Sequence, residues 1–424
     1  MNVDVNFTEQ PQGPRAGFVT NYPHYKNWKK SDHKYAFSQN PLSIYIHIPF
    51  CAQQCSYCYY KVLTGTDRAL RDQYIDALCR EIEIASDQFQ LRRREIVSVY
   101  FGGGTPTLLT EAQFGKVVDT LQRVLNLHDF EFTVEAEPVT LTKKTGDYLR
   151  KAGVNRLSLG VQSLSDEILK KTNRHDTEAS VFKAIEIAKT VAPVVNIDLL
   201  SGLSGETCDT WAYSVERAIA SGAESITIYK VDLYSNSEYY RDLRHGTLTL
   251  PNDEVEMDFM RYAQAELFLN GYKPWSFFTF TKDGKYPHRH SSNIWQGGDC
   301  YALGASAFGV MGNSLFQNTN DPWKYVQSIN SNELAIHRGY QLSNLEKMIR
   351  EALLGMKLVR FSLVDYQRRH GFKLHALCDA TVRSLIDDGY IEMIDDEIVK
   401  TDKGILYADY VGKQVAKDLT ARFC

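Results

Sequence analysis

Short apolar runs rich in Val, Ile, Tyr and Phe recur along the first half of the chain, and longer segments with helical spacing separate them. Runs of this length, bounded by polar residues, are typical of β-strands. We therefore predict six strands, at residues 43–48, 97–101, 131–135, 155–161, 194–200 and 225–230.

The segments between these runs carry apolar residues on one helical face. Residues 67–86 place an apolar side chain at every fourth position from Leu70 to Ile82, and residues 111–126 show a similar stripe. This spacing predicts amphipathic helices that pack on a sheet. Strands alternating with helices predict an α/β fold with a parallel sheet and right-handed crossovers. In such folds, ligands bind at the carboxyl ends of the strands.

The pattern changes twice after the predicted sheet. From about residue 285 the chain is rich in Gly, Ser and Asn, which is typical of loops and short strands that close over a site. After residue 340 it returns to helical spacing, followed by "DDGYIEMIDDEIVKT", which predicts two strands around a turn. We predict an amino-terminal extension (1–40), a barrel (41–284), a covering region (285–339) and a small α+β domain (340–424).

Composition narrows the class of protein. The chain has 424 residues, a net charge of −4 and dispersed Lys and Arg residues, so no basic face indicates a nucleic-acid partner. Its amino terminus is polar and acidic, unlike a signal peptide. No segment offers the roughly 18 uninterrupted apolar residues of a membrane span. We expect a cytoplasmic protein without stable membrane insertion.

Three of the eight cysteines, Cys51, Cys55 and Cys58, lie within eight residues. In a reducing compartment such thiols are metal ligands more often than disulfides. A structural zinc site needs four ligands in two pairs, and no second pair follows. Three cysteines suit a 4Fe–4S cluster with one open iron. The other five cysteines lie far apart and are interpreted as buried or incidental thiols.

The string "IYIHIPFCAQQCSYC" resembles the signature of the radical S-adenosylmethionine (SAM) enzymes, and within them the branch of oxygen-independent coproporphyrinogen III oxidase. This resemblance implies a partial (β/α)6 barrel and a winged-helix-like carboxyl-terminal domain. It also implies that the open iron chelates SAM, and that a donor such as flavodoxin or ferredoxin reduces the cluster. Cleavage of SAM then yields a 5′-deoxyadenosyl radical.

The resemblance also assigns SAM contacts. Tyr45 would pack beside the sulfonium, and it is the only residue to which we assign a catalytic role. The glycine motif "FGGGTPT" would approach the amino group of SAM, because glycine lets the backbone come close to a ligand. The full predicted set of cofactor contacts is Tyr45, Gly103, Gly104, Thr105, Glu135, Gln162, Arg174 and Asp198.

Details of the sequence favour one group within the branch. Tyr60 replaces a fourth cysteine of the porphyrin oxidase, and "HSSNIW" and "GASAFG" replace two strings of the heme chaperones. We therefore predict a class C radical SAM C-methyltransferase that uses two SAM molecules to methylate an sp² carbon of a heteroaromatic, quinone or tetrapyrrole ring. A heme chaperone is the alternative, and coproporphyrinogen III oxidation is a third possibility. His288 and His290, in a polar segment, are expected to be exposed.

Overall fold

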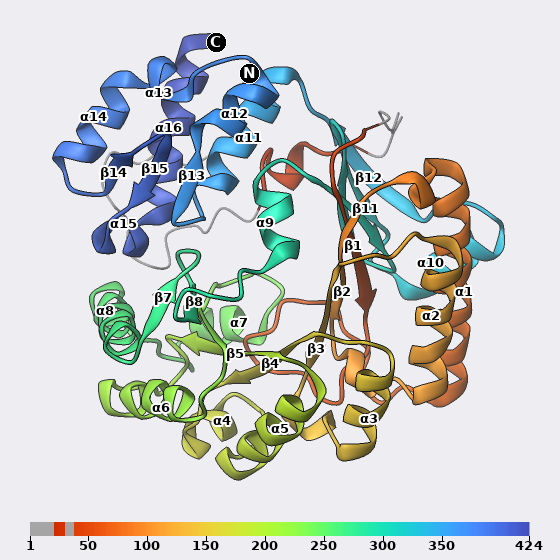
Figure 1. Ribbon diagram of the computed structural model, residues 1–424. Coiled ribbons are helices and arrows are strands. Elements are labelled where there is room, and N and C mark those ends of the chain that lie inside the picture. Colours follow the sequence, from red (N-terminus) through yellow and green to blue (C-terminus); the bar gives the residue numbers. More distant parts are fainter. Residues whose placement is uncertain (1–20, 30–37, 424) are drawn as a thin grey trace.

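The computed structural model describes residues 21–29 and 38–423 (Figure 1). Most of the predicted amino-terminal extension, together with Cys424, lies outside the described residues. The domain borders predicted at 285 and 340 stay predictions.

Six neighbouring parallel strands form the centre of the molecule, in their order along the chain. All six predicted strands are confirmed. Their bounds are β1 Leu42–Ile48, β2 Ile96–Gly103, β3 Glu131–Ala136, β4 Arg156–Gln162, β5 Val194–Ser201 and β6 Ser225–Lys230.

Helices cover the outer face of these strands (Figure 1). Tyr74, Leu78 and Ile82 of α1 are fully buried, as their spacing of four residues predicted. Burial of this apolar stripe stabilises the fold, because each such side chain contributes about 1.5–3 kcal/mol when removed from water. The helices are α1 Arg68–Phe89, α2 Glu111–Val124, α3 Lys143–Lys151, α4 Asp166–Lys171, α5 Glu178–Val191, α6 Cys208–Ala220, α7 Glu238–His245 and α8 Asp253–Leu269.

The sheet extends beyond the six strands at both edges. Next to β6 lie antiparallel β8 (Thr279–Lys282) and β7 (Tyr272–Pro274). On the other side, β9 (Asp299–Leu303) pairs parallel with β1, and β10 (Phe308–Met311), β11 (Ser314–Asn318) and β12 (Ile336–Gln341) follow as antiparallel neighbours. Much of the segment after residue 285 forms short strands that continue the sheet, and its role as a cover stays a prediction.

Two further helices belong to this segment. The short helix α9 (Arg289–Trp295) packs against β1, β2 and β9, and α10 (Pro322–Asn330) packs on α1. In Figure 1, α9 lies between the barrel strands and the carboxyl-terminal domain. The segment 285–339 therefore contributes one helix to the opening of the barrel.

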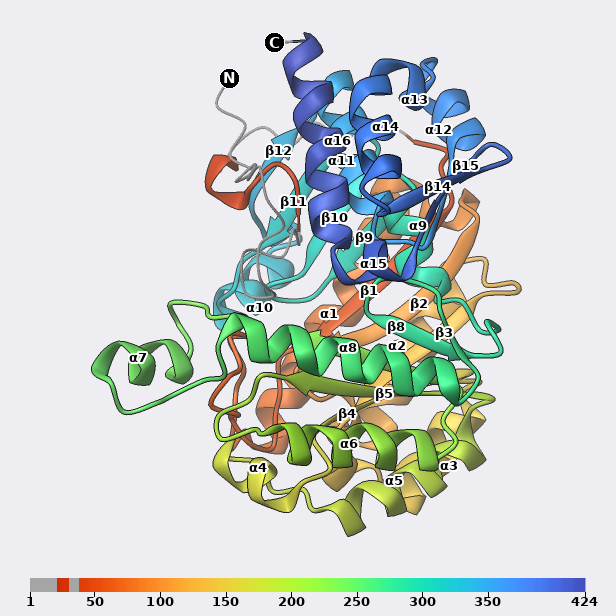
Figure 2. The same cartoon turned by 90° about the vertical axis from the view of Figure 1, so that its left-hand side faces the viewer.

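The carboxyl-terminal part has its own apolar core and a three-stranded antiparallel sheet, which confirms the winged-helix-like prediction. Figure 2 shows it above the barrel, with α7 projecting to the left side. No helix among the described residues is long and apolar enough to span a membrane. The elements are α11 Asn344–Gly355, β13 Arg360–Ser362, α12 Leu363–His370, α13 Leu374–Leu377, α14 Asp379–Asp387, β14 Ile391–Ile394, β15 Glu397–Lys400, α15 Asp402–Leu406 and α16 Ala408–Phe423.

Candidate functional site

Two adjoining cavities lie inside the barrel. The cluster-side cavity, of about 440 Å³, contains the three clustered cysteines, and the large cavity, of about 730 Å³, lies next to it. Both volumes fall within the range of cofactor and small-molecule sites. Five strand residues line both cavities, and we call them the junction residues: Tyr100, Glu135, Ser158, Asp198 and Tyr229.

The three cysteines lie on the loop that connects β1 to α1. Backbone hydrogen bonds anchor this loop at its start, where the N–H of Cys51 donates to the carbonyl of Leu63 at 3.0 Å. Farther along, the Asn173 side chain donates to the carbonyl of Gln54 at 2.8 Å. The loop is therefore held by contacts from distant parts of the chain.

All three cysteines are free thiols in a largely buried setting. Burial raises the pKa of Cys51 to about 12 and that of Cys58 to about 11, so without metal these thiols stay protonated. The hydroxyl of Thr105 donates to the Cys51 sulfur at 3.4 Å, and the guanidinium of Arg174 donates to the Cys55 sulfur at 3.6 Å. Such donors stabilise a thiolate. Because the free thiols are protonated and a metal binds thiolates, metal binding at this loop must release protons.

The cysteines fit a cluster better than a single ion. Among the described residues, no group of three or more His, Cys, Asp or Glu side chains converges as ligands of one metal ion. In a 4Fe–4S cluster each cysteine binds a different iron, so the sulfurs need not converge on one point. Three free thiols lining one cavity, two of them with hydrogen-bond donors, fit this arrangement.

The glycine motif permits a close approach at the end of β2. Gly103 has φ +107°, a conformation that other residues rarely adopt, and a Cβ there would lie 2.5 Å from the ring of His47. A Cβ on Gly104 would lie 2.6 Å from the carbonyl oxygen of Phe50 and 3.0 Å from the Cys51 sulfur. Glycine is therefore required where the strand passes the cysteine loop.

Glu135 lies at the junction of the two cavities. Its carboxylate accepts a hydrogen bond from the hydroxyl of Tyr100 at 2.6 Å and another from the N–H of Gly103 at 3.0 Å. Burial, together with the nearby charge of Asp198, raises the pKa of Glu135 to about 7. The side chain is thus a carboxyl group that can change protonation near neutral pH.

Asp198 is the second acidic junction residue. Its two oxygens accept hydrogen bonds from Ser158 and Asn196, both at 2.8 Å. Burial raises the pKa of Asp198 to about 6. It can accept further hydrogen bonds from a ligand in either cavity.

Arg174 lies beside the cysteine loop, and its guanidinium is shared among several groups. It forms an ion pair with the carboxylate of Asp176, 2.7 Å between Nη2 and Oδ2, and donates to the carbonyl of Gly160 at 2.6 Å, besides its contact with Cys55. Gln162 lines the same cavity. Sequence reasoning missed Asp176 and also Glu137, whose carboxylate oxygen lies 3.9 Å from the Arg174 guanidinium. An acidic residue two positions after Glu135, just past the end of β3, was the available signal.

Tyr45 lines the large cavity and not the cluster-side cavity. Its hydroxyl lies 3.1 Å from Nδ1 of His47, and its ring stacks on Tyr100 with the ring centroids 5.9 Å apart. The structure therefore places Tyr45 in a different cavity from Gly103, Gly104, Gln162 and Arg174, while Glu135 and Asp198 line both cavities.

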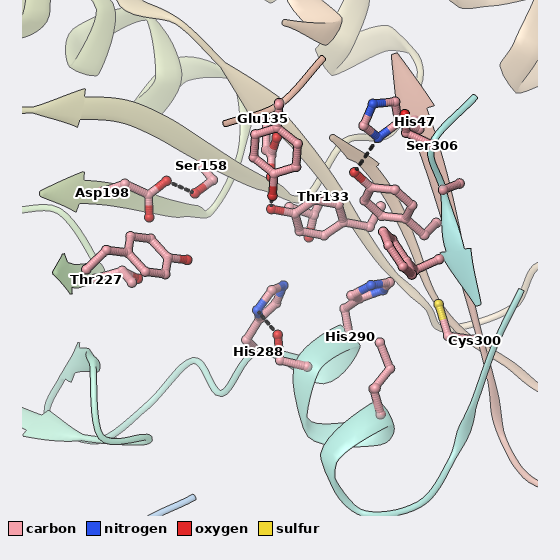
Figure 3. A pocket seen from close by; sticks show the side chains of 18 of the residues that line it. His47, Thr133, Glu135, Ser158, Asp198, Thr227, His288, His290, Cys300 and Ser306 are labelled. Atoms are coloured by element: carbon pink, nitrogen blue, oxygen red, sulfur yellow. Dashed lines mark hydrogen bonds between the residues drawn. The ribbon is translucent and has the colours of Figure 1, made fainter. Parts of the chain in front are cut away.

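His288 and His290 are not exposed, so the expectation for them was wrong. His290 is buried and lies 2.9 Å from the hydroxyl of Ser98. Figure 3 shows both rings on α9, facing the strand residues Thr133 and Asp198 across the large cavity. Burial lowers the pKa of His290 to about 3, and burial together with the Arg156 charge lowers the pKa of His288. Both imidazoles are therefore neutral.

Alternate residues along the strands form the lining of the large cavity. Each of Thr133, Arg156, Asn196 and Thr227 stands two positions before a junction residue on its own strand. We call these four the floor residues, because they line the large cavity only. The signal was present in the sequence as polar residues inside otherwise apolar runs, at a spacing of two.

Comparison with known proteins gives consistent results. A sequence profile described as "Radical SAM superfamily" matches residues 45–218. The chain is 28% identical to the heme chaperone HemW of Bacillus subtilis, over 87% of this chain and 97% of that protein. It is 30% identical to the oxygen-independent coproporphyrinogen III oxidase of Pseudomonas aeruginosa, over 76% of this chain and 73% of that protein. The crystallised coproporphyrinogen III oxidase (HemN) of Escherichia coli matches with a TM-score of 0.80 at 23% identity, covering 93% and 96% of the two chains.

These findings overturn the prediction of a ring C-methyltransferase. The relatives over most of the chain are named as heme chaperones and coproporphyrinogen oxidases, so class C methyltransferase activity is not supported. The prediction relied on Tyr60 and on two short strings after residue 285. One of them belongs to α9 and the other to the turn between β9 and β10, so their differences lie inside the extended sheet region.

Proposed function

Because the chain belongs to the radical SAM superfamily, in the branch that contains heme chaperones and oxygen-independent coproporphyrinogen III oxidases, we propose that it binds a tetrapyrrole and acts as a heme chaperone. One observation carries the proposal: a cavity of about 730 Å³ adjoins the cysteine loop and is walled by aromatic side chains. Flat aromatic walls suit a large planar ring.

The cluster-side cavity is the proposed site of the cofactors that the family implies. Cys51, Cys55 and Cys58 would hold a 4Fe–4S cluster, and Gly103, Gly104, Glu135, Gln162, Arg174 and Asp198 would surround SAM, with Thr105 adjoining through its contact with Cys51. A cluster held there would, when reduced, supply the electron for cleavage of SAM. Flavodoxin or ferredoxin would be suitable electron donors. The chain itself orients the groups and keeps water from them.

The large cavity offers aromatic and imidazole groups to a tetrapyrrole. Trp275 and Trp295 stack with their ring centroids 5.6 Å apart, and both line the cavity. The neutral imidazole of His290 is a candidate ligand of a heme iron, since neutral imidazole is a common iron ligand. We place the heme against α9 for this reason.

A second function is favoured by the junction residues. A chaperone without turnover does not need its ligand beside SAM, yet Tyr100, Glu135 and Asp198 line both cavities. Because the two cavities share these residues, a ligand in the large cavity would lie next to SAM. This arrangement supports oxidation of a reduced tetrapyrrole by hydrogen abstraction. Tyr60, in place of the fourth cysteine, is the departure from the oxidase pattern.

The test is titration of anaerobically reconstituted protein with heme. A chaperone should give a shifted Soret band that saturates at about one equivalent, whether or not SAM is present. A Soret band identical to that of free heme, with no saturation, would contradict the chaperone proposal.

The second function needs a separate experiment. Reduced protein should release 5′-deoxyadenosine with coproporphyrinogen III, at a rate above that without it, if the chain is an oxidase. Equilibrium dialysis with labelled SAM counts the SAM molecules bound per chain. One is expected if a tetrapyrrole is the ligand of the large cavity, and two would mean that a second SAM binds there.

A further inference from the structure

The floor of the large cavity is polar and carries one buried positive charge. Arg156 is the first residue of β4, and its exposed fraction is only 4%. A strand rises about 3.3 Å per residue, so this side chain stands about 6.6 Å deeper in the barrel than the junction residue Ser158. The cysteine loop lies beyond the opposite, carboxyl end of the strands.

Arg156 has no carboxylate in direct contact with its guanidinium, although its charge opposes the rise that burial causes in the pKa of Asp198. Its nitrogens donate to the backbone carbonyl of Tyr286 at 3.4 Å and to the hydroxyl of Ser225 at 3.3 Å, which are both long hydrogen bonds. Among the described residues it forms no ion pair within 4.0 Å. Burying an unpaired charge costs several kcal/mol, so proteins seldom leave one without a role.

Two other polar atoms near the floor also lack hydrogen-bond partners among the described residues. The hydroxyl of Thr133 is one, and Nε2 of His288 is the other. Nε2 of His288 lies 3.3 Å from a carboxylate oxygen of Glu131 without hydrogen-bond geometry. Nδ1 of the same ring is 3.0 Å from the hydroxyl of Ser291, which can donate to it and leave the proton on Nε2. Both atoms are then available as donors.

The acidic residues that line this cavity are engaged elsewhere. Asp198 is held by Ser158 and Asn196, and Glu135 by Tyr100 and Gly103. Figure 3 shows Thr133, Asp198 and Thr227 on one side of the cavity and His288 on the other. The open space between them is bordered by the Arg156 cation and by two donors without partners, while the Asp198 carboxylate at its edge already accepts two hydrogen bonds; this combination suits a bound anion.

We propose that Arg156, Thr133 and His288 form a subsite for one carboxylate arm of the ligand in the large cavity. The arm reaches the floor of the barrel while the body of the ligand stays against the aromatic wall. Arg156 is then a specificity residue that selects acids over esters or amides. This inference rests on the proposed function in one respect, namely that the large cavity is the ligand site.

The test compares acids with their methyl esters on wild-type protein and on Arg156→Met. The probes are hemin and hemin dimethyl ester, followed by the Soret band, and 3-phenylpropionate and its methyl ester, followed by ligand-observed NMR. A charge-assisted contact to a carboxylate should favour the acid roughly ten- to hundredfold in wild type. Arg156→Met should bring that ratio near one while ester affinity stays unchanged.

The control variant is Arg289→Met, on the same helix as His288. Arg289 is partly exposed, contacts Asp129 and does not line the cavity, so the acid preference should persist. If Arg156→Met fails to fold by circular dichroism, Thr133→Val removes one donor without changing charge, and it should lower the preference several-fold.

The outcomes separate this inference from the proposed function. Hemin and its ester binding equally well to wild type, or an unchanged acid preference in Arg156→Met, would overturn the carboxylate subsite while leaving tetrapyrrole binding intact. Preference for 3-phenylpropionate over its ester, lost in Arg156→Met but without any binding of hemin, would support the subsite and contradict the heme chaperone.

Discussion

Replacement of Glu135 by Gln should change how the stability of the cofactor-free protein depends on pH. The carboxyl is buried at the junction of the two cavities, and its pKa is raised from 4.5 to about 7. The folded state therefore holds this proton more tightly than the unfolded chain. Its contribution to stability is fully present below about pH 4.5, and it is lost as the pH rises through about 7.

The magnitude follows from the raised pKa. Each tenfold change in proton affinity is worth about 1.4 kcal/mol, so wild type should lose about 3 kcal/mol between about pH 4.5 and about pH 8 through this group. Gln does not titrate, so Glu135→Gln should lack this loss. Gln also offers one acceptor oxygen where the carboxylate offers two, and the N–H of Gly103 then loses its partner. That cost is the same at every pH.

The assay is urea unfolding of both proteins at several pH values. The free energy of unfolding of Glu135→Gln, minus that of wild type, should rise by about 3 kcal/mol across the range. Glu167→Gln is the control, because Glu167 is an exposed partner of Lys171 whose charge solvent screens in both states. A difference that stays flat with pH would refute the reasoning about burial at the junction.

Two further predictions concern the cysteine loop and the glycine motif. Cys55→Ala should reduce iron and acid-labile sulfide from about four of each per chain to near zero, because two thiolates rarely retain a 4Fe–4S cluster. The control Cys208→Ala, at an exposed cysteine, should keep both. Retention of iron and sulfide in Cys55→Ala would refute the cluster assignment. Gly103→Ala should lower the melting temperature by several degrees, because its Cβ would collide with His47. Gly115→Ala, in α2 with nothing within 4 Å, should raise it slightly, and equal effects of the two would contradict the steric argument.

The barrel could be predicted from sequence because each strand and helix has a local signal. Strand β6, Ser225–Lys230, was predicted with its observed bounds, because polar residues flank its short apolar run on both sides. Strands β9 to β11 were not placed individually, since the covering region is rich in Gly and Ser and its strands are at most five residues long. The pairing of β9 with β1 joins residues more than 250 positions apart, which no local pattern encodes.

The candidate site was predictable only where residue types are distinctive. Cysteine spacing and the glycine run identify one cavity, because few other roles need those residues in that order. Thr133, Arg156 and His288 have ordinary residue types, and their proximity appears only when three separate segments meet. The burial of His288 depends on α9 entering the barrel opening, which a polar sequence did not indicate.

The central claim is that a tetrapyrrole sits beside the cluster, and fluorescence quenching tests it most directly. Zinc protoporphyrin fluoresces, and a nearby iron–sulfur cluster quenches that emission. Reconstituted wild type should bind the porphyrin with strongly quenched emission, whereas cluster-free Cys55→Ala should bind it with similar affinity and bright emission. Equal emission from the two bound complexes, or no binding by either protein, would contradict the account.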